Sequence, residues 1–492
     1  MRRRWLFGDQ LGPTFLDAPD QPVLMIEAHA VLRRRPFHRQ KAHLILSAMR
    51  HRAAELGDQV TYLVTDTYRE GLAQVDEPLS VLQPTSWPAV HFVDQLATER
   101  DVERLPARGY ATDRADFTAW ADARGGKRLL MEDFYRDARR RLDVLMEGGE
   151  PVRNRWNFDA ENREPPPRTA TLGLPEPSWP TEDEIDDQVR ADLDRLEREG
   201  VRFVGEDGPR TFAATRAEAV GALADFIEHR LPTFGRYEDA ILREDRWMAH
   251  SMLSAPLNLG LLDPLEEVDA AVEAYRSGDA PIESVEGFVR QVIGWRDYIW
   301  HLYWYLGEDY RQHNVLQADV DLPDWFVELD PSGTDAHCLQ WALTSVRETA
   351  WAHHIPRLMV LGNYALQRGW NPQQLTDWFH RSFIDGYDWV MGPNVVGMSQ
   401  HADGGILATK PYAGGGNYIN TMTDLCGNCV YDPKLRRGEK ACPFTAGYWL
   451  FLHRHRERFA GNHRMSQMVR NLDRLADLDQ LLAENPTGFP RQ

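Results

Sequence analysis

Cysteine is scarce in this chain, with four residues among 492, and long apolar runs are lacking. No stretch approaches the ~20 apolar residues of a membrane-spanning helix. The apolar part of the opening sequence MRRRWLFGDQL is also too short for a secretion signal. These shortages indicate a cytoplasmic protein with no membrane partner. Disulfides are rare in that compartment, so cysteines that lie close together in a sequence more often hold a metal.

Basic residues are outnumbered, with 56 Lys and Arg against 75 Asp and Glu and a formal net charge of −19. Phosphate backbones attract basic surfaces, so the overall charge argues against nucleic-acid binding. The charge is uneven, however. Residues 181–200 are strongly acidic, whereas residues 451–470 contain five arginines and a single acidic residue, Glu457. A locally basic face on an acidic protein is therefore compatible with this composition.

The first part of the chain alternates strand-like and helix-like segments. The apolar or β-branched runs at 23–28, 60–66 and 89–94 predict strands, and the periodic segment 37–56 predicts a helix between the first two. Strands that alternate with helices indicate a parallel sheet. The sequence therefore predicts a Rossmann-like α/β domain over residues 1–135.

The rest of the chain has a different character. Proline is dense between residues 150 and 180, which indicates a connector, and we assign this connector to residues 136–205. From about residue 210 the pattern is almost wholly helical. We therefore predict a large all-α domain over residues 206–492, in keeping with a length that suggests about two to three domains.

The four cysteines have the spacing of a metal site. Cys426, Cys429 and Cys442 follow the pattern C-x2-C-x12-C, and Cys338 lies alone far upstream. Four thiolates suit either tetrahedral zinc or an iron–sulfur cluster, and four unrelated buried cysteines are a third reading. Pro443 directly after Cys442, and the single Cys338 from a predicted helix in place of a second short pair, favour the cluster.

A long ordered set of motifs resembles one known family. The set comprises LFGDQL, FHRQKAHLILSAMRH, RNRWNFDAENRE, FGRYEDA, HSMLSAPLNLGLLDP, VIGWRDYIW, WAHHIPRLMVLGNYAL and YINTMTDLCGNCVYDPKLRRGEKACPFTAGYWLFLHRHRERFAGNHRM. Nearly the whole chain resembles the iron–sulfur branch of the photolyase/cryptochrome family, which contains prokaryotic (6-4) photolyases and bacterial cryptochromes. The resemblance implies an α/β antenna domain, a helical FAD-binding domain and a [4Fe–4S] cluster on the four cysteines.

The resemblance also implies the residues that contact FAD. Taken alone, the serines of HSMLSAPLNL suit helix capping, and Arg357 and Asp385 suit ordinary surface charges. A buried carboxylate beside a flavin would need a cationic partner. The resemblance implies that the FAD pyrophosphate and ribityl chain are lined by Tyr237, Ser251, Leu253 and Ser254. It implies that Trp295 and Arg296 lie beside the adenine, and that Arg357 and Asp385 lie against the flavin ring.

An electron route to the flavin requires Trp or Tyr side chains. Trp378 matches the tryptophan that lies next to the flavin in the family. Relatives often carry an aromatic residue just before the GTD sequence, where this chain has Asp330, so the usual route is broken or passes through Trp341 or Trp389. Met391 is a second departure, since some relatives have an acidic residue there, close to flavin N5.

The substrate side is marked by the pair His353–His354. Adjacent helical residues point about 100° apart, so these two predict one core and one surface histidine and no shared metal. The family's HHxxR motif implies a (6-4) photolyase, with His354 as proton donor, His353 as its partner and Tyr412 (with Lys410 a weaker candidate) beside the lesion. UV-damaged DNA would contact a basic face made of Lys434, Arg436, Arg437, Arg454 and Arg458.

An antenna chromophore and the alternatives complete these expectations. Relatives often bind 6,7-dimethyl-8-ribityllumazine, and Asp9, Gln10 and Glu27 lie at predicted strand ends where α/β folds place ligands, although they also suit helix capping. We expect a monomeric, light-driven (6-4) photolyase. A cryptochrome-type photoreceptor with the same cofactors is the main alternative, and a DNA-binding zinc protein is the third.

Overall fold

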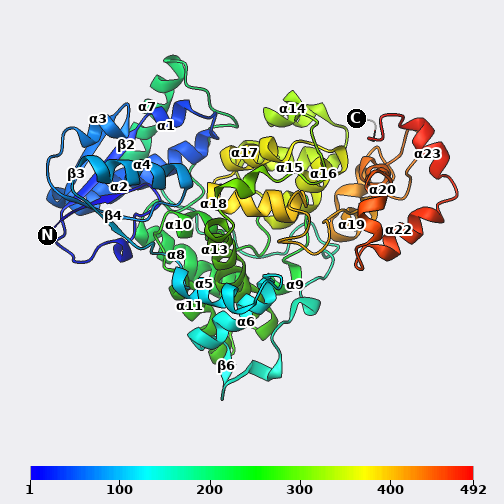
Figure 1. Cartoon of the computed structure of the whole chain (residues 1–492), viewed down its shortest axis with the longest axis horizontal. Helices are drawn as coiled ribbons and strands as arrows, with labels where there is room; N and C mark the ends of the chain where they lie inside the picture. Colours follow the sequence, from blue (N-terminus) through cyan, green and yellow to red (C-terminus); the bar gives the residue numbers. More distant parts are fainter. Residues whose placement is uncertain (1, 491–492) are drawn as a thin grey trace.

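The computed structural model describes residues 2–490 and places a parallel sheet at the N-terminal end of the molecule (Figure 1). Five strands pair in the order β3–β2–β1–β4–β5, and Trp5 at the centre pairs with Leu24 on one side and Val81 on the other. The strands predicted at 23–28 and 60–66 are confirmed. The strand bounds are β1 Arg3–Leu6, β2 Val23–Ala28, β3 Val60–Thr65, β4 Leu79–Leu82 and β5 Val102–Leu105.

The predicted strand at 89–94 is wrong, because these residues lie inside helix α4, Trp87–Glu99. Pro88 occupies the first turn of this helix, where its missing N–H costs nothing. Val93 and Leu96 are buried three residues apart on one face. The next strand after β3 is instead β4. Its four residues are all buried, as an inner strand of a parallel sheet requires.

Helices cover both faces of the sheet. The predicted helix at 37–56 is confirmed as α2, Arg39–Leu56, and its inner side chains pack with Met25 of the sheet. On the other face Trp5, Leu24 and Leu96 share a core. The short helices on this domain are α1 Ala30–Arg33 and α3 Tyr68–Leu72.

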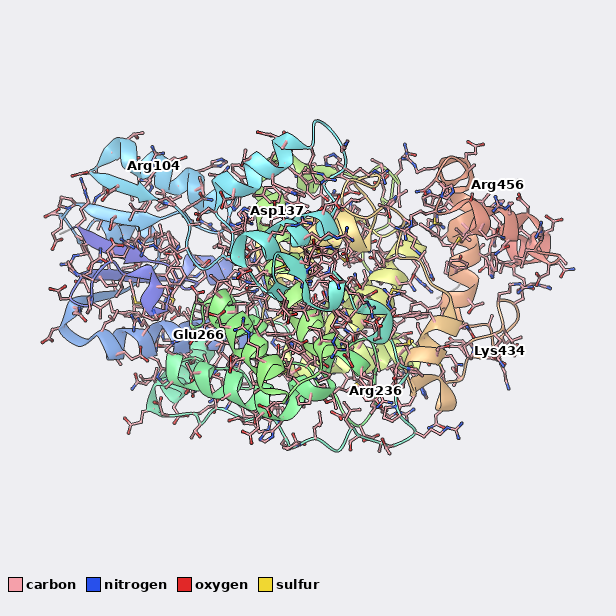
Figure 2. All side chains as sticks on the ribbon, turned by 90° about the horizontal axis from the view of Figure 1, so that it is seen from below. Arg104, Asp137, Arg236, Glu266, Lys434 and Arg456 are labelled. Carbon is pink, nitrogen blue, oxygen red and sulfur yellow. The ribbon has the colours of Figure 1, made fainter. Side chains whose placement is uncertain are left out.

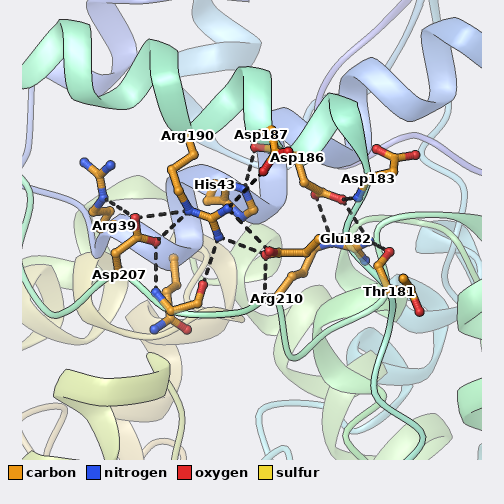
Figure 3. A network of polar contacts seen from close by, with 12 residues as sticks. Arg39, His43, Thr181, Glu182, Asp183, Asp186, Asp187, Arg190, Asp207 and Arg210 are labelled. Carbon is orange, nitrogen blue, oxygen red and sulfur yellow. Dashed lines mark hydrogen bonds and ion pairs between the residues drawn. The ribbon is translucent and has the colours of Figure 1, made fainter.

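The proline-rich connector ends in a helix that packs on α2. Residues 165–183 contain no helix or strand, and α7 follows at Glu184–Arg198. Figure 3 shows the ion pairs that fix it: Arg210 Nε lies 3.0 Å from Asp186 Oδ1, with both side chains buried. Arg39 of α2 bonds Glu197 of α7 at 2.7 Å. The acidic run at 181–200 is thus neutralised by arginines from both neighbouring segments.

The remaining chain forms the predicted helical domain, with several short π-helical stretches (Figure 1). Helix α5 of the predicted first domain and helix α6, which crosses the predicted boundary at residue 135, both pack on α13, where Phe117 stacks on His301 at 4.8 Å. The division at residue 135 stays a prediction. The bounds are α5 Arg114–Ala123, α6 Met131–Leu142, β6 Met146–Glu147, β7 Glu150–Pro151, α8 Arg216–Asp225, η5 Phe226–Arg230, α9 Leu231–Tyr237, α10 Ser254–Asn258, α11 Pro264–Ser277, α12 Ile282–Val289, η6 Arg290–Arg296, α13 Asp297–Tyr305, α14 Asp324–Val327, α15 His337–Thr349, η9 Pro356–Gly362, α16 Asn363–Arg368, α17 Pro372–Ser382, α18 Asp388–Met391, η10 Gly392–Ser399, α19 Gly416–Met422, α20 Pro443–Arg454, α21 Arg456–Ala460, α22 Ser466–Asp473 and α23 Leu478–Glu484.

Candidate functional site

Arg357 and Asp385, predicted as a pair beside the flavin ring, are joined in the structure. Arg357 Nη1 donates to Asp385 Oδ1 at 2.8 Å and Nη2 donates to Oδ2 at 3.1 Å. Arg357 Nε also donates to the carbonyl of Ala352 at 2.6 Å, which fixes the orientation of the guanidinium. Ser254 at the start of α10 donates its hydroxyl to Asp385 Oδ2 at 2.8 Å. Three predicted residues from distant parts of the chain therefore meet at one buried carboxylate.

The network extends to Arg296 through Asn258, a residue that the sequence did not single out. Asn258 Nδ2 donates to the carbonyl of Asp385 at 3.3 Å, and Arg296 Nε donates to Asn258 Oδ1 at 3.4 Å. The Arg296 guanidinium also lies 4.7 Å from the ring centroid of Tyr110. Ser254, Arg296, Arg357 and Asp385 thus belong to one connected set of polar groups.

Lys41 of α2 is a second group that the sequence did not single out. It is 3% exposed, and its Nζ donates to the carbonyls of His380, at 2.6 Å, and Gly386. Burial lowers the pKa of Lys41 to about 7, against the opposing charge of Asp385. A lysine in an amphipathic helix ordinarily reads as a surface charge, so nothing in the sequence pattern distinguished it.

Four other residues predicted to contact FAD stay outside this network within residues 2–490. Ser251 accepts a hydrogen bond from the backbone N–H of Leu253 at 3.4 Å, which is local capping, and Leu253 is buried in the core. Tyr237 ends α9 and packs near Met248. Trp295 lies in η6 with its ring 6.1 Å from that of Tyr298. Their flavin contacts stay predictions.

Three histidines gather on the predicted lesion side. The rings of His250 and His353 stack at 4.1 Å, and one nitrogen each of His250, His353 and His354 lie within 4.8 Å of one another. The predicted division into one core and one surface histidine is confirmed, since His353 is buried and the His354 side chain is 49% exposed. The expectation that the two rings point too far apart to share a metal is wrong, because residues 351–353 are not helical and the ring nitrogens approach one another. His250 was missed, although it directly precedes Ser251 in the quoted motif.

The three histidines differ in protonation. His353 is 4% exposed, and neither ring nitrogen has a hydrogen-bond partner among the described residues. Burial lowers the pKa values of His250 and His353 well below the ordinary value, so both rings are neutral. His354 is half exposed, and its Nε2 lies 3.1 Å from Asp239 Oδ1. The surrounding protein opposes a charge there, but the hydrogen bond and charge of Asp239 outweigh it and raise the pKa of His354.

Tyr412 lies on the same side of the molecule. Burial raises the pKa of this half-buried phenol, on which Arg163 and Asp239 also act electrostatically. The charge of Asp239 thus reaches both Tyr412 and His354. Lys410 is half buried and forms no ion pair within the described chain.

All four cysteines line one small cavity, together with Gly416 and Phe444. Cys338 is the second residue of α15 and is buried, and Cys442 is the residue before α20. Burial raises the pKa values of the Cys338, Cys426 and Cys442 thiols, that of Cys426 to about 12, and neighbouring cysteines add to the effect. Backbone N–H groups of Phe444 and Thr445 act in the opposite direction on Cys442. Thiols this close and this buried need a cation to hold them as thiolates.

The predicted antenna residues have unequal surroundings. Glu27 accepts two hydrogen bonds from Arg50, at 3.0 and 2.8 Å, and one from Tyr62 at 2.6 Å. Burial raises the pKa of Glu27, but these partners and His29 outweigh it and hold it at about 2. Asp9 bonds Thr85 through one oxygen, while its other, buried oxygen has no partner within residues 2–490. Gln10 is buried nearby.

Only part of the predicted basic face is free of ion pairs. Arg436 bonds Asp477 at 2.7 Å, Arg437 bonds Glu484 at 2.8 Å, and Arg454 donates to backbone carbonyls. Lys434 and Arg458 are exposed and form no ion pair within the described chain. Figure 2 shows Lys434 and Arg456 projecting from the C-terminal end of the molecule.

Across the described residues, every helix is either too short or too polar to cross a bilayer.

Comparison with known proteins agrees with this architecture. Residues 4–206 match the family described as deoxyribodipyrimidine photo-lyase-related protein. The chain is 39% identical over 495 residues to the (6-4) photolyase of Agrobacterium fabrum (strain C58 / ATCC 33970), which covers 96% of this chain and 95% of that one. Uncharacterized protein R853 of Acanthamoeba polyphaga mimivirus is 38% identical over 74 residues, 15% of this chain and 57% of its own.

The fold has a counterpart among solved structures. A bacterial class III photolyase from Agrobacterium tumefaciens superposes with a TM-score of 0.54 over 82% of this chain and 79% of that chain, at 14% identity. An N-terminal parallel sheet followed by a helical domain is therefore a shared architecture. Together with the near full-length match, this shows that the chain belongs to the photolyase/cryptochrome family, in the branch that contains the bacterial (6-4) photolyase.

Proposed function

We propose that this protein is a light-driven (6-4) photolyase, which repairs (6-4) pyrimidine photoproducts in UV-damaged DNA. The observation that carries the proposal is the 39% identity with a protein of that name along 96% of the chain. The lesion-side geometry supports it, because His354 and Tyr412 both lie within the electrostatic reach of Asp239.

FAD is the cofactor that this function requires, and the residues present suit it. The carboxylate of Asp385 has Arg357, Ser254 and a nearby Lys41 to fix it, and Nε2 of His250 and both ring nitrogens of His353 lack protein partners in the described part of the chain. Bound FAD, once reduced and excited by light, supplies an electron to the photoproduct. Arg357 and Arg296 supply positive charge, and the buried surroundings exclude water.

The protein's own contribution to the chemistry is a proton. His354 is half exposed, so a lesion can reach it, and Asp239 keeps it protonated toward neutral pH. A positioned acid of this kind typically contributes about 10²–10⁴ in rate. His353 and His250 stack on each other beside His354, and both are neutral, which leaves His354 as the proton donor of the three.

A [4Fe–4S] cluster suits the four-cysteine cavity better than zinc. Zn–S bonds of about 2.3 Å would bring the four sulfur atoms to within roughly 3.8 Å of one another. Among the described residues, the groups whose ligand atoms all lie within 4.8 Å contain no cysteine. A Cβ on residue 416 would meet Cys442 Sγ at 2.6 Å, so Gly416 leaves room where the cluster would lie.

The α/β domain would hold 6,7-dimethyl-8-ribityllumazine as an antenna. Asp9 supports this role because one of its buried oxygens lacks a partner within residues 2–490, and Gln10 lies next to it. Glu27, with Arg50, would form the wall of that site. The protein would act as a monomer in the cytoplasm.

The deciding experiment is illuminated repair of a synthetic (6-4) oligonucleotide by reduced protein, beside an oligonucleotide with a cyclobutane dimer. We expect repair of the (6-4) photoproduct and none of the dimer. The second candidate, a photoreceptor with the same cofactors, is favoured by Asp330 and Met391, which depart from the family pattern. Repair of neither lesion, by protein that contains flavin and iron, would establish that candidate and refute ours.

A further inference from the structure

We propose that electrons reach the flavin through Trp325 and Trp370, with Trp325 as the surface donor; the proposal rests on the FAD site described above. The route begins beside Arg357, whose guanidinium lies 4.2 Å from the ring centroid of Phe383. Trp378 lies next, 5.9 Å from Phe383, and is 1% exposed. An indole one ring away from the Arg357–Asp385 pair can donate an electron to a flavin bound beside that pair. Because Trp378 is buried, it cannot take a replacement electron directly from a reductant in solution.

An unbroken run of rings leads outward from Trp378. Its ring centroid lies 4.3 Å from that of Phe326, and its Nε1 donates to the Phe326 carbonyl at 2.8 Å. Phe326 contacts Trp370 at 4.7 Å, and Trp370 contacts Trp325 at 6.2 Å. Phe326 and Trp370 are buried, whereas Trp325 is half buried. Indoles are oxidisable and the phenyl ring bridges two of them, so the run connects the interior with solvent.

The position of the Trp325 ring is set by the turn that contains Asp330. A Cβ on residue 333 would lie 2.2 Å from Trp325 Cγ, so the ring packs directly over Gly333. The backbone N–H of Asp330 donates to the Trp325 carbonyl at 2.7 Å, and the Asp330 side chain caps the turn through Ser332. Asp330 cannot carry an electron itself, but the turn that contains Asp330 holds the Trp325 ring in place.

A second branch leads from Trp370 toward the cysteines and is less favourable. Tyr364 lies 5.5 Å from Trp370, and Phe444, which lines the cysteine cavity, lies 5.6 Å beyond. The Arg368 guanidinium sits 3.3 Å from the Tyr364 ring centroid and opposes a positive charge on that ring. Burial raises the pKa of Tyr364, so the phenol keeps its proton. Oxidation of Tyr364 is therefore disfavoured, and electrons enter from Trp325.

The other tryptophans considered from the sequence do not join the run. Trp341 donates its indole N–H to the carbonyl of Arg243, and no ring contact joins it to another aromatic side chain in the part of the chain described. Trp389 contacts Tyr110 at 5.6 Å and Trp300 at 5.4 Å, on the side of the α/β domain. Neither offers a ring-to-ring path from Trp378.

Each light-driven event would move one electron inward along the run. Trp378 would give one electron to bound, oxidised FAD, Trp370 would refill Trp378, and Trp325 would refill Trp370. A soluble thiol would return one electron to Trp325 in each event. Over two events two thiols would join in one disulfide and release two protons, and the flavin would take up one of these protons with its two electrons to reach the anionic reduced state that repair requires.

The test uses the holoprotein under blue light with a soluble thiol, and follows the disappearance of oxidised-flavin absorbance. We expect Trp325→Phe to lose most of the photoreduction rate and Gly333→Ala to lower it by displacing the Trp325 ring. Trp370→Phe should lower the rate less than Trp325→Phe, because Phe326 also contacts Trp325 directly at 5.7 Å. Tyr364→Phe and Trp341→Phe are matched controls that keep the wild-type rate. Time-resolved absorption should show a tryptophan radical that is longer-lived in wild type than in Trp325→Phe.

Unchanged photoreduction in Trp370→Phe and Trp325→Phe, or loss of it in Tyr364→Phe, would overturn the route. Flavin and iron contents are measured for every variant, and Trp325→Phe, at a half-exposed site, serves if Trp370→Phe is unstable. Repair by chemically reduced protein should be equal in wild type and Trp325→Phe. If reduced wild type repairs nothing, the proposed function fails, while the photoreduction rates still decide the route.

Discussion

Asp239 Oδ1 lies 3.1 Å from His354 Nε2, and this contact places a carboxylate behind the half-exposed histidine of the lesion side. Because the pKa of His354 is raised, the ring keeps its proton at pH values above about 6.5, the ordinary pKa of histidine. A general acid must carry its proton, so repair should persist above pH about 6.5 and fall as pH rises through the raised pKa of His354. Repair rates of pre-reduced protein measured across pH would show this limb.

Asp239→Asn removes the charge that favours protonated His354, so the alkaline limb should move to lower pH. Asp309→Asn, at an exposed position, is the control and should leave the limb in place. His354→Ala should lose nearly all repair, by about 10²–10⁴ in rate, and still retain FAD. An alkaline limb that is the same in wild type and Asp239→Asn would show that His354 is not the titrating acid.

Gly416→Ala tests the four-cysteine site without removing a ligand. The added Cβ would lie 2.6 Å from Cys442 Sγ and 3.1 Å from the carbonyl of Pro433, so it must displace the sulfur or the helix. We expect a lower iron content per chain by elemental analysis. Gly427→Ala, between two cysteines but with nothing within 4 Å of its Cβ, is the matched control and should retain wild-type iron.

Cys→Ala at each of the four positions should abolish iron binding and give poorly soluble protein, because ligand binding contributes to folding. Wild-type protein with about one zinc and negligible iron per chain would contradict the cluster. Equal iron in Gly416→Ala and Gly427→Ala would show instead that the cavity beside Gly416 does not hold it.

Asp385→Ala should cost stability as well as flavin. The carboxylate is buried and bonded by Arg357 and Ser254, so its removal leaves an unpaired buried charge and should lower the free energy of unfolding by about 3–5 kcal/mol. Asp377→Ala breaks a half-exposed pair with Arg311 and should cost no more than about 1 kcal/mol. Denaturant unfolding, with flavin counted in the protein-bound fraction, measures both; equal losses in the two variants would refute the role of Asp385.

Continuous apolar strands and the periodic α2 were predictable from sequence, because buried parallel strands and amphipathic helices leave plain patterns. The run at 89–94 was ambiguous, since six residues of which four are apolar suit a strand or part of a helix such as α4. Cys338 and the HHxxR pair were predictable from the motif order. Lys41 and Asn258 were not, because their roles depend on contacts with segments more than a hundred residues away.

The basic face shows the same limit. Arg436 and Arg437 read as free charges in the sequence, but Asp477 and Glu484 from the C-terminal helices neutralise them. Local composition does not reveal pairs that are more than forty residues apart. Arg458 keeps its charge unpaired within the described chain, and the same charge helps to hold the pKa of His455, already lowered by burial, at about 4.

Arg458→Ala should therefore weaken DNA binding more than Arg437→Ala, and more at low salt than at high salt. A side chain that contacts one backbone phosphate contributes about 0.9 to the slope of log affinity against log salt concentration, because one counterion is released. Titration of a labelled (6-4) duplex at several salt concentrations should show that slope flattened by about 0.9 in Arg458→Ala. Arg437 is already paired with Glu484, so Arg437→Ala should leave the slope nearly unchanged. If the salt dependence of affinity falls equally in both variants, the DNA contacts Arg437 as well as Arg458. If it changes in neither variant, the DNA binds to another surface of the protein.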